Sequence, residues 1–315
     1  MKPGRLAAEG PRALWSFRRR ARPAHMEMLE GGRAWSVVFS VPALVLLGVF
    51  FIYPFGVIVL HSFTEWDGIG PSQWVGLDNF KDLLDDEAFR TALKNNFLFA
   101  VAVPVQVLLS LVIAVLLYER TPGWRLFRAI FFLPVVISPV VIGLMWTAIF
   151  DLYGPINVVL DSLGLDGVSR DWLGDSSTSI PAIMLVVLWA TFGFNMMIFL
   201  AGLSSMSPTL LDAARVDGAG WWASLWHVIV PAQRRVIELV VVLNLITAFS
   251  YMLPFVFVMT GGGPGHDTYV SELLIYDEGF NFGRLGYASA ISVALFAVVS
   301  VLMFAYVRML RRQEL

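Results

Sequence analysis

The chain has 315 residues, of which 57% are hydrophobic and only 15% are charged, and its mean hydropathy is +0.72. A soluble domain normally carries about 25% charged residues, so this composition excludes an ordinary water-soluble domain and indicates an integral membrane protein. The formal net charge is only −2. The chain contains no cysteine, which excludes disulfide bonds, thiolate metal sites and cysteine nucleophiles.

Residues 1–34 form a basic tail with eight Lys and Arg residues, including Arg18, Arg19, Arg20 and Arg22. A basic segment beside a membrane span favours contact with anionic lipid headgroups over nucleic-acid binding. The apolar stretch that follows is too long for the core of a signal peptide, and no small-residue cleavage site comes after it. We therefore expect this stretch to be retained as the first membrane span.

Six apolar stretches are long enough for the roughly 20 residues with which a helix crosses a membrane. Unpaired backbone groups are costly in lipid and no period-2 pattern is visible, so each stretch is expected to be a helix. The predicted spans are residues 35–60, 92–117, 129–150, 180–203, 236–259 and 285–307. The sequence thus predicts an all-α integral membrane protein with six transmembrane helices.

The orientation follows from the basic residues between the spans. Segments 1–34, 118–128, 204–235 and 308–315 hold seventeen Lys and Arg residues, whereas 61–91, 151–179 and 260–284 hold four, together with sixteen acidic residues. The positive-inside rule places the first group in the cytoplasm. The domain organisation is therefore a cytoplasmic tail (1–34), a membrane domain (35–307) with a cytoplasmic loop at 204–235, and a second cytoplasmic tail (308–315).

The predicted spans contain almost no charge. Glu238 lies near a helix end, and all four histidines lie outside the spans. Proton-coupled carriers need acidic or histidine relays inside the membrane, so proton coupling is disfavoured, while sodium coupling through backbone and hydroxyl oxygens stays open. We find no catalytic constellation and no metal site in the sequence.

The loop at 204–235 reads as two short helices separated by glycine. Ser207 is a suitable N-cap with Pro208 at the first helical position, and Gly218 is placed for a left-handed helix end. A second helix is expected over 221–229, ending at Pro231. On periodicity alone, an interfacial helix with tryptophans at the headgroups explains this second helix equally well.

The residue types in this loop carry a family resemblance. Residues 212–219 read Asp-Ala-Ala-Arg-Val-Asp-Gly-Ala, and residues 228–231 read Val-Ile-Val-Pro. This run resembles the cytoplasmic "EAA" loop of the permeases of binding-protein-dependent ABC importers, with Asp212 in place of Glu and Val230 in place of Leu. Residues 76–80, 153–157, 259–265 and 282–290 are similar to further motifs of the maltose-type carbohydrate permeases.

The resemblance implies a maltose-type ABC importer permease fold, in a bacterial cytoplasmic (inner) membrane. Such a permease imports a sugar by alternating access and pairs with a second homologous permease, two cytoplasmic ATP-binding subunits and an extracellular solute-binding protein. The chain itself would be no enzyme and bind no cofactor, because none of its three lysines lies in a phosphate-binding loop; ATP and Mg would be bound by the partner subunits.

The resemblance also implies which residues face the ATPase. The coupling residues would be Asp212, Ala213, Ala214, Asp217, Gly218, Ala219, Trp222 and Pro231. The alternative for Asp212 is a solvated carboxylate stabilised by the helix dipole, and Asp217 could be a local cap. On the outside, Asp82, Asp85, Asp86 and Glu87 are either a docking surface for the solute-binding protein or a solvated face.

In the family, the solute site lies on the spans that flank this loop. Hydrogen-bonding and aromatic residues there make the candidate site, and Asn244, Thr247 and Tyr251 share a helical face. The candidate residues are Trp189, Thr191, Asn195, Asn244, Thr247, Phe249 and Tyr251. The alternative is polar packing between helices. An ABC permease for a glycerol phosphate derivative or a polyamine, and a sodium-coupled carrier, remain alternatives, and the sequence does not identify the solute.

Overall fold

The computed structural model describes residues 39–311, so the predicted tail at 1–34 lies outside the described residues. The chain divides into two compact units, residues 1–56 and 57–315. In the first unit the described residues are helical and include the π-helical turn η1 (Gly48–Ile52) and the start of α2 (Tyr53–His61). The helix Phe39–His61 has 23 residues and a mean hydropathy of 2.6, which suits the predicted first span.

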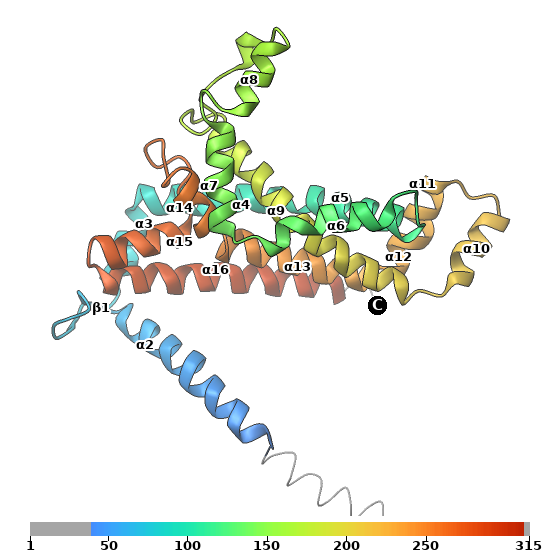
Figure 1. Ribbon diagram of the computed structural model, residues 1–315. Helices are drawn as coiled ribbons and strands as arrows, with labels where there is room; N and C mark the ends of the chain where they lie inside the picture. The colour runs from blue at the N-terminus through green and yellow to red at the C-terminus, as the bar shows by residue number, and fades with distance from the viewer. Residues whose placement is uncertain (1–38, 312–315) are drawn as a thin grey trace, which may run out of the picture. The chain divides into compact units, whose positions relative to one another are not determined.

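In the second unit, the end of α2 is followed by a short hairpin and one helix that precede the second span (Figure 1). Strands β1 (Thr64–Glu65) and β2 (Gln73–Trp74) pair antiparallel, and α3 (Asp78–Asp85) follows. Asp86 caps α4 (Glu87–Val101) by accepting hydrogen bonds from the N–H groups of Ala88 and Phe89. Helix α5 (Val103–Tyr118) continues α4, and together they form an apolar stretch of 32 residues.

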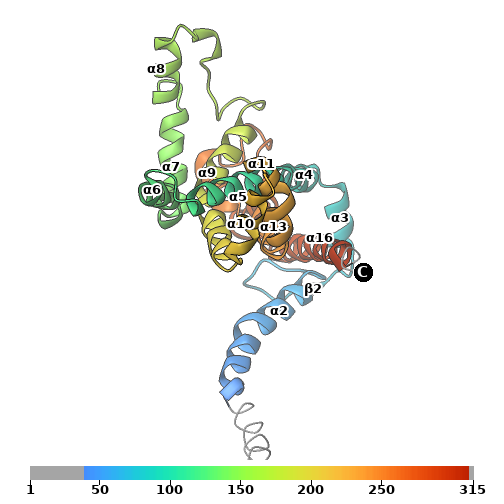
Figure 2. The same ribbon diagram turned by 90° about the vertical axis from the view of Figure 1, so that its right-hand side faces the viewer.

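The third predicted span, at 129–150, is not one helix, and that prediction is wrong. The chain forms α6 (Trp124–Val136) and α7 (Pro139–Phe150), and α7 leaves the direction of α6 in both views (Figures 1 and 2). The cause is Pro139, which forces the preceding residue out of the helical region: Ser138 has φ −58° and ψ 136°. The apolar stretch long enough to span is Pro139–Ser162, which includes α8 (Pro155–Ser162) and is followed by the turn η2 (Asp166–Val168).

The later spans agree more closely with the sequence. Helix α9 (Ser179–Ser204) is continuous, whereas the fifth span is a pair, α13 (Arg234–Ser250) and α14 (Leu253–Met259), bent by 45°. Then come α15 (Ser271–Tyr276), the π-turn η4 (Asp277–Asn281) and α16 (Leu285–Arg311), so residues 308–311 are helical where a tail is expected. Counting the bent pair as one, residues 39–311 contain six candidate spans, as predicted.

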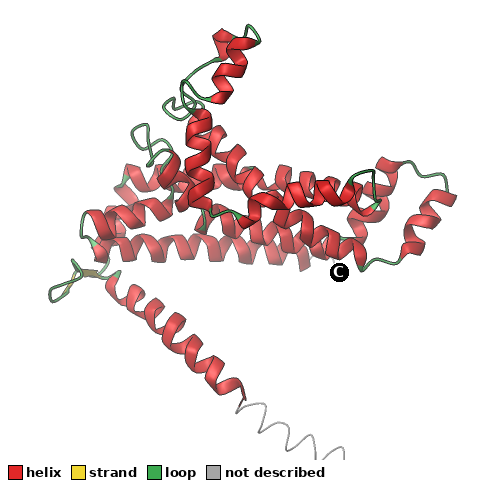
Figure 3. Cartoon of the chain, in the orientation of Figure 1, coloured by secondary structure: helices red, strands yellow, loops and turns green. Residues whose placement is uncertain are grey.

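The loop between α9 and α13 contains the two expected helices, joined by an irregular turn (Figure 3). Helix α10 (Pro208–Val216) ends at Gly218, whose φ is +77°, and the Ala219 N–H returns to the Ala214 carbonyl at 2.9 Å. The second helix is built from α11 (Trp221–Ser224), the π-turn η3 (Leu225–Ile229) and α12 (Val230–Ala232).

Pro231 does not stop this second helix, contrary to the prediction. Proline is tolerated in the first turn of a helix, where its missing N–H has no partner to lose, and Pro231 lies in the first turn of α12 directly after the wide π-turn. The break comes two residues later at Gln233, directly before α13 begins at Arg234.

Helix α9 links the two hydrophobic cores of the second unit. Its first half, including Ile183 and Val186, packs in a cluster with α4, α7, α13, α14 and α16. Its second half, including Met196 and Phe199, packs in a cluster with α5, η3 and α13. A continuous apolar helix touched on several sides by others is a buried helix, so α9 is the element around which the second unit is assembled.

Candidate functional site

A pocket of about 410 Å³ lies where α6, α7, α9, α13 and the α13–α14 break meet. Its wall is mostly apolar, with a few hydroxyl and amide side chains, and none of its lining residues is charged. Phe194 and Tyr251 present half-exposed aromatic rings to it. This is the composition of a site for a small polar molecule, where apolar faces give contact area and a few polar groups give orientation.

Five of the seven predicted substrate residues line this pocket: Thr191, Asn195, Asn244, Thr247 and Tyr251. Asn195 Nδ2 donates to Asn244 Oδ1 at 3.1 Å, and both side chains are buried. Asn244 Nδ2 in turn donates to the Val240 carbonyl at 2.7 Å. The polar groups of α9 and α13 are therefore held in a fixed orientation by one another.

The hydroxyl of Thr191 is also fixed by its neighbours. It donates to the Val187 carbonyl at 2.7 Å and is bonded to the side-chain amide of Gln106 on α5. Gln106 was not among the predicted site residues; a buried glutamine in an apolar stretch is the signal that could have indicated it.

The other two predicted substrate residues do not line the pocket. Trp189 packs edge-to-face against Trp146, with ring centroids 5.7 Å apart, and contributes to the hydrophobic core. Phe249 is 1% exposed and packs edge-to-face against Phe97. Both lie one or two residues from lining residues, but helical geometry turns them to another face.

Two further polar residues border the pocket from behind the α13–α14 break. Asn96 on α4 and Glu272 on α15 bond to the backbone at the break, next to Ser250 and Tyr251 of the pocket wall. Glu272 lies outside the predicted spans, so counting charges within apolar stretches does not find it.

The α10–α12 segment forms one end of the second unit, which Figure 2 views directly. Leu225 and Ile229 anchor it in the core, while Asp212, Ala213 and Asp217 are exposed and Trp222 is 61% exposed. Of the remaining predicted coupling residues, Gly218 and Pro231 are exposed, Ala219 is half-buried and Ala214 is buried.

Two contacts organise this end. Asp212 and Arg215 form an exposed ion pair at 3.5 Å. Trp221 Nε1 donates to Glu119 at 3.2 Å, which ties the segment to the turn after α5. This end of the second unit thus presents a helical surface that carries the Asp212–Arg215 ion pair and two exposed tryptophans, Trp222 and Trp226.

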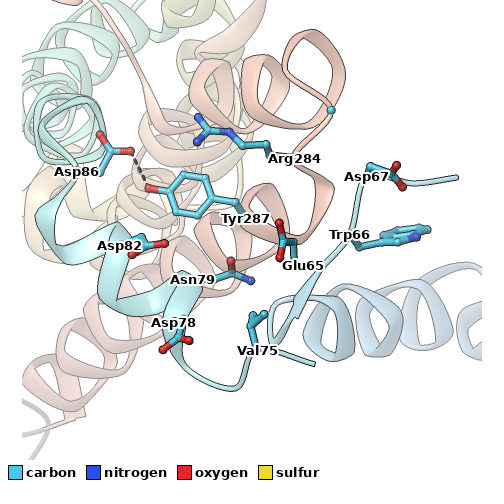
Figure 4. Close-up of a pocket in the computed structure, with 11 residues that line it drawn as sticks. Glu65, Trp66, Asp67, Val75, Asp78, Asn79, Asp82, Asp86, Arg284 and Tyr287 are labelled. Atoms are coloured by element: carbon cyan, nitrogen blue, oxygen red, sulfur yellow. Dashed lines mark hydrogen bonds between the residues drawn. The ribbon is translucent and has the colours of Figure 1, made fainter. Parts of the chain in front are cut away.

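The opposite end of the second unit carries an acidic pocket of about 650 Å³, shown in Figure 4. Five carboxylates line it against a single cation, Arg284. The carboxylates are those of Glu65, Asp67, Asp78, Asp82 and Asp86. Of the four predicted docking residues, Asp82 and Asp86 line the pocket, whereas Asp85 and Glu87 do not.

The geometry keeps this pocket anionic. Hydrogen bonds from the N–H groups of Gly70 and Ile69, both 3.0 Å, lower the pKa of Asp67. The Tyr287 hydroxyl donates to Asp86 at 2.7 Å, and Asn79 Nδ2 joins α3 to the hairpin through the Ser62 and Thr64 carbonyls. A concave acidic surface attracts cationic groups and raises their association rate.

Comparison with known proteins places the chain in a family. Residues 87–314 match the family described as "Binding-protein-dependent transport system inner membrane component". The chain is 34% identical over 281 residues to the probable ABC transporter permease protein YurN of Bacillus subtilis, covering 87% of this chain and 95% of YurN. It is 30% identical over 285 residues to the multiple sugar-binding transport system permease protein MsmF of Streptococcus mutans, covering 89% of this chain and 96% of MsmF.

A solved structure shares the fold. It is that of a bacterial alginate ABC transporter in complex with an alginate pentasaccharide-bound periplasmic protein, and one of its chains matches with a TM-score of 0.76 and 23% identity. The match covers 89% of this chain and 96% of that one. With a family match over most of the sequence and relatives of similar length, the chain belongs to the family of inner membrane components of binding-protein-dependent transport systems.

Proposed function

We propose that this chain is the permease subunit of an ATP-driven ABC importer that carries an uncharged sugar or sugar-like solute across the inner membrane by alternating access. The observation that carries this proposal is the pocket between α9 and α13, the two helices that flank the exposed α10–α12 segment. Its hydroxyl and amide groups match the hydroxyls of a sugar, and its aromatic rings match the apolar faces of a pyranose.

The pocket wall carries no charge, which favours an uncharged solute over a charged one. A glycerol phosphate derivative or a polyamine would be desolvated on entry, and a desolvated charge needs an opposite charge beside it. The lining residues of this pocket include none. Relatives named for sugar transport support a sugar, whereas others are named for sulfoquinovosyl glycerol and sn-glycerol-3-phosphate. The preference for a neutral sugar over charged solutes therefore rests on the uncharged pocket wall.

Uptake into proteoliposomes tests this assignment. The importer, assembled with its ATPase subunits and loaded solute-binding protein, should take up a neutral sugar in an ATP-dependent manner and should reject phosphorylated and cationic solutes. Gradient-driven uptake by the isolated chain, without ATP, would instead establish a secondary carrier.

We further propose that α10–α12 docks on a cytoplasmic ATPase subunit, with Asp212 as the carboxylate that a basic residue of that subunit recognises. The exposure of Asp212 and the anchoring of Leu225 and Ile229 in the core support this role, because a docking helix needs a free outer face and a rigid base. ATP binding would pull this segment and so move α9 and α13 about the pocket.

The matched pair of variants is Asp212→Ala and Arg215→Ala, because Asp212 and Arg215 are bonded to each other in an exposed ion pair. If Asp212 acts on the ATPase, D212A should weaken co-purification of the ATPase and uncouple hydrolysis from uptake, while R215A leaves both near wild type. Equal effects of both variants would mean that Asp212 serves only its local ion pair.

The extracellular solute-binding protein is expected to dock over the acidic pocket of Figure 4, through basic side chains. Charge complementarity of this kind mainly raises the association rate and weakens with salt. Asp82→Asn should therefore slow binding of the solute-binding protein at low salt. Asp166→Asn removes the same charge from the exposed turn η2, outside the pocket, and should leave the rate unchanged.

A further inference from the structure

The bend between α13 and α14 lies just before Pro254, which cannot continue a straight helix, and two side chains from other helices also hold the backbone open there. In a continuous helix the N–H of Met252 would bond to the carbonyl of Ala248, four residues earlier. Here the Met252 N–H donates to Glu272 Oε1 at 3.0 Å, and the Ala248 carbonyl accepts from Asn96 Nδ2 at 2.7 Å. Two side chains thus occupy both ends of one opened helical hydrogen bond, a known cause of sharp kinks.

The two inserted side chains are also joined to each other. Asn96 Nδ2 lies 3.3 Å from Glu272 Oε2, and Asn96 Oδ1 accepts from the Ser271 N–H at 2.9 Å. Asn96 is fully buried, and Glu272 is partly buried. The bridge from α4 through the break to α15 is therefore shielded from water, where hydrogen bonds are hardest to replace.

The opened bond lies beside the solute pocket. Ser250 and Tyr251, which line the pocket, lie between Ala248 and Met252. Tyr251 has left the helix, with φ −143° and ψ 19°, and α14 continues at 45° to α13. If the Met252–Ala248 bond closed, the backbone at 248–252 would return toward helical geometry and Tyr251 would move with it, while Pro254 would still keep α14 bent away from α13.

We propose that Glu272 and Asn96 are positioning residues of the solute pocket: by holding the α13–α14 hydrogen bond open, they place Tyr251 and Ser250 in the pocket wall. Neither residue lines the pocket, so both act through the backbone. This inference rests on the proposed function only where uptake of solute is measured. The geometry of the break can be measured without any transport assay.

The test uses the assembled importer with Glu272→Leu and Glu272→Gln. Leucine cannot accept the Met252 N–H, whereas glutamine keeps an acceptor oxygen at nearly the same place. E272L should raise the KM for uptake about tenfold or more, as expected for loss of a charge-assisted hydrogen bond, with much less change in kcat. E272Q should restore part of the loss, because it keeps the acceptor for Met252 but turns an NH2 group toward Asn96 Nδ2.

Asp277→Leu is the matched control. Asp277 is a partly buried carboxylate on the next helical turn, bonded to Tyr269 and Asn281 and not to the break. D277L should therefore leave the KM near the wild-type value, although it removes a carboxylate from the same segment.

A second readout follows the break itself. The chain has no cysteine, so spin labels at Leu239→Cys on α13 and Phe257→Cys on α14 report the distance across the bend without further mutation. E272L should shift this distance and D277L should not. An unchanged distance in E272L, or a shifted distance with an unchanged KM, would overturn the proposal. If neither the wild type nor any variant takes up a sugar, the proposed function is wrong, but the spin-label distance still tests whether Glu272 holds the α13–α14 break open.

Discussion

At Gly193, helix α9 lies directly against the backbone of α6, which allows a stringent prediction. A Cβ atom added at Gly193 would lie 2.1 Å from the Phe131 carbonyl oxygen, 3.0 Å from its carbon and 3.2 Å from the Phe132 Cα. Ordinary contacts begin at 3.4 Å, and all three neighbours are backbone atoms that cannot turn aside. Gly193→Ala must therefore push α6 away from α9 as a unit.

The expected cost is that of overpacking a well-ordered core, about 1–3 kcal/mol. A gain in helix propensity of at most about 1 kcal/mol offsets part of this cost. For a protein of this size each kcal/mol lowers the melting temperature by roughly 2–4 °C. The control is Gly167→Ala, because no heavy atom lies within 4 Å of a Cβ built there.

Thermal unfolding in mild detergent, followed by tryptophan fluorescence, measures the difference between the two variants. G193A should melt several degrees below G167A. Because Pro134 of α6 and Thr191 of α9 line the pocket, the same shift should also raise the KM for uptake. If G193A has the same melting temperature as G167A and keeps the wild-type KM, then the close approach of α6 and α9 does not constrain the fold as we argue.

Three further predictions concern polar side chains. Asn244→Ala leaves the Asn195 amide without its 3.1 Å acceptor and should cost about 1–3 kcal/mol of stability, seen as a lower melting temperature; no change would mean that water replaces the bond. Asn157→Ala removes the acceptor of the Trp172 N–H, 2.8 Å away, and should expose residues 151–178 to limited proteolysis, whereas resistance equal to wild type would contradict a structural role. Burial raises the pKa of Glu278 above its ordinary value of 4.5, although Arg284 opposes the shift. Because the pKa is higher in the folded state, the folded protein loses stability as the pH rises above 4.5. Glu278→Gln should therefore melt at a higher temperature than wild type at neutral pH, and the difference should vanish toward pH 4.5.

The site was partly predictable because helical spacing decides which residues share a face. Thr191 and Asn195 lie four residues apart, and Asn244 and Thr247 three apart, so each pair points into the same pocket. The same geometry turns Trp189 and Phe249 away, which a list of polar and aromatic residues in two spans cannot reveal.

The helix breaks were harder to predict, because a hydropathy window records how apolar a stretch is and not which way it runs. Pro139 is a local signal for the α6–α7 break and could have been used. The α13–α14 break has a similar local signal in Pro254, but the hydrogen bond that opens there also depends on Glu272 and Asn96, which are 20 residues away from Met252 and 152 away from Ala248 along the chain.

By itself, the sequence determined the membrane-protein class, the number of spans, the family and the helix–glycine–helix loop, because length, apolarity, capping and left-handed glycine are properties of neighbouring residues. The tertiary structure alone decided which polar groups face one pocket, which carboxylates gather at one end and which side chains hold the fifth span open at its bend. Those features depend on backbone groups and side chains that meet only when distant segments pack together. In this protein the clearest case is one opened helical hydrogen bond, held apart by two residues from two other helices.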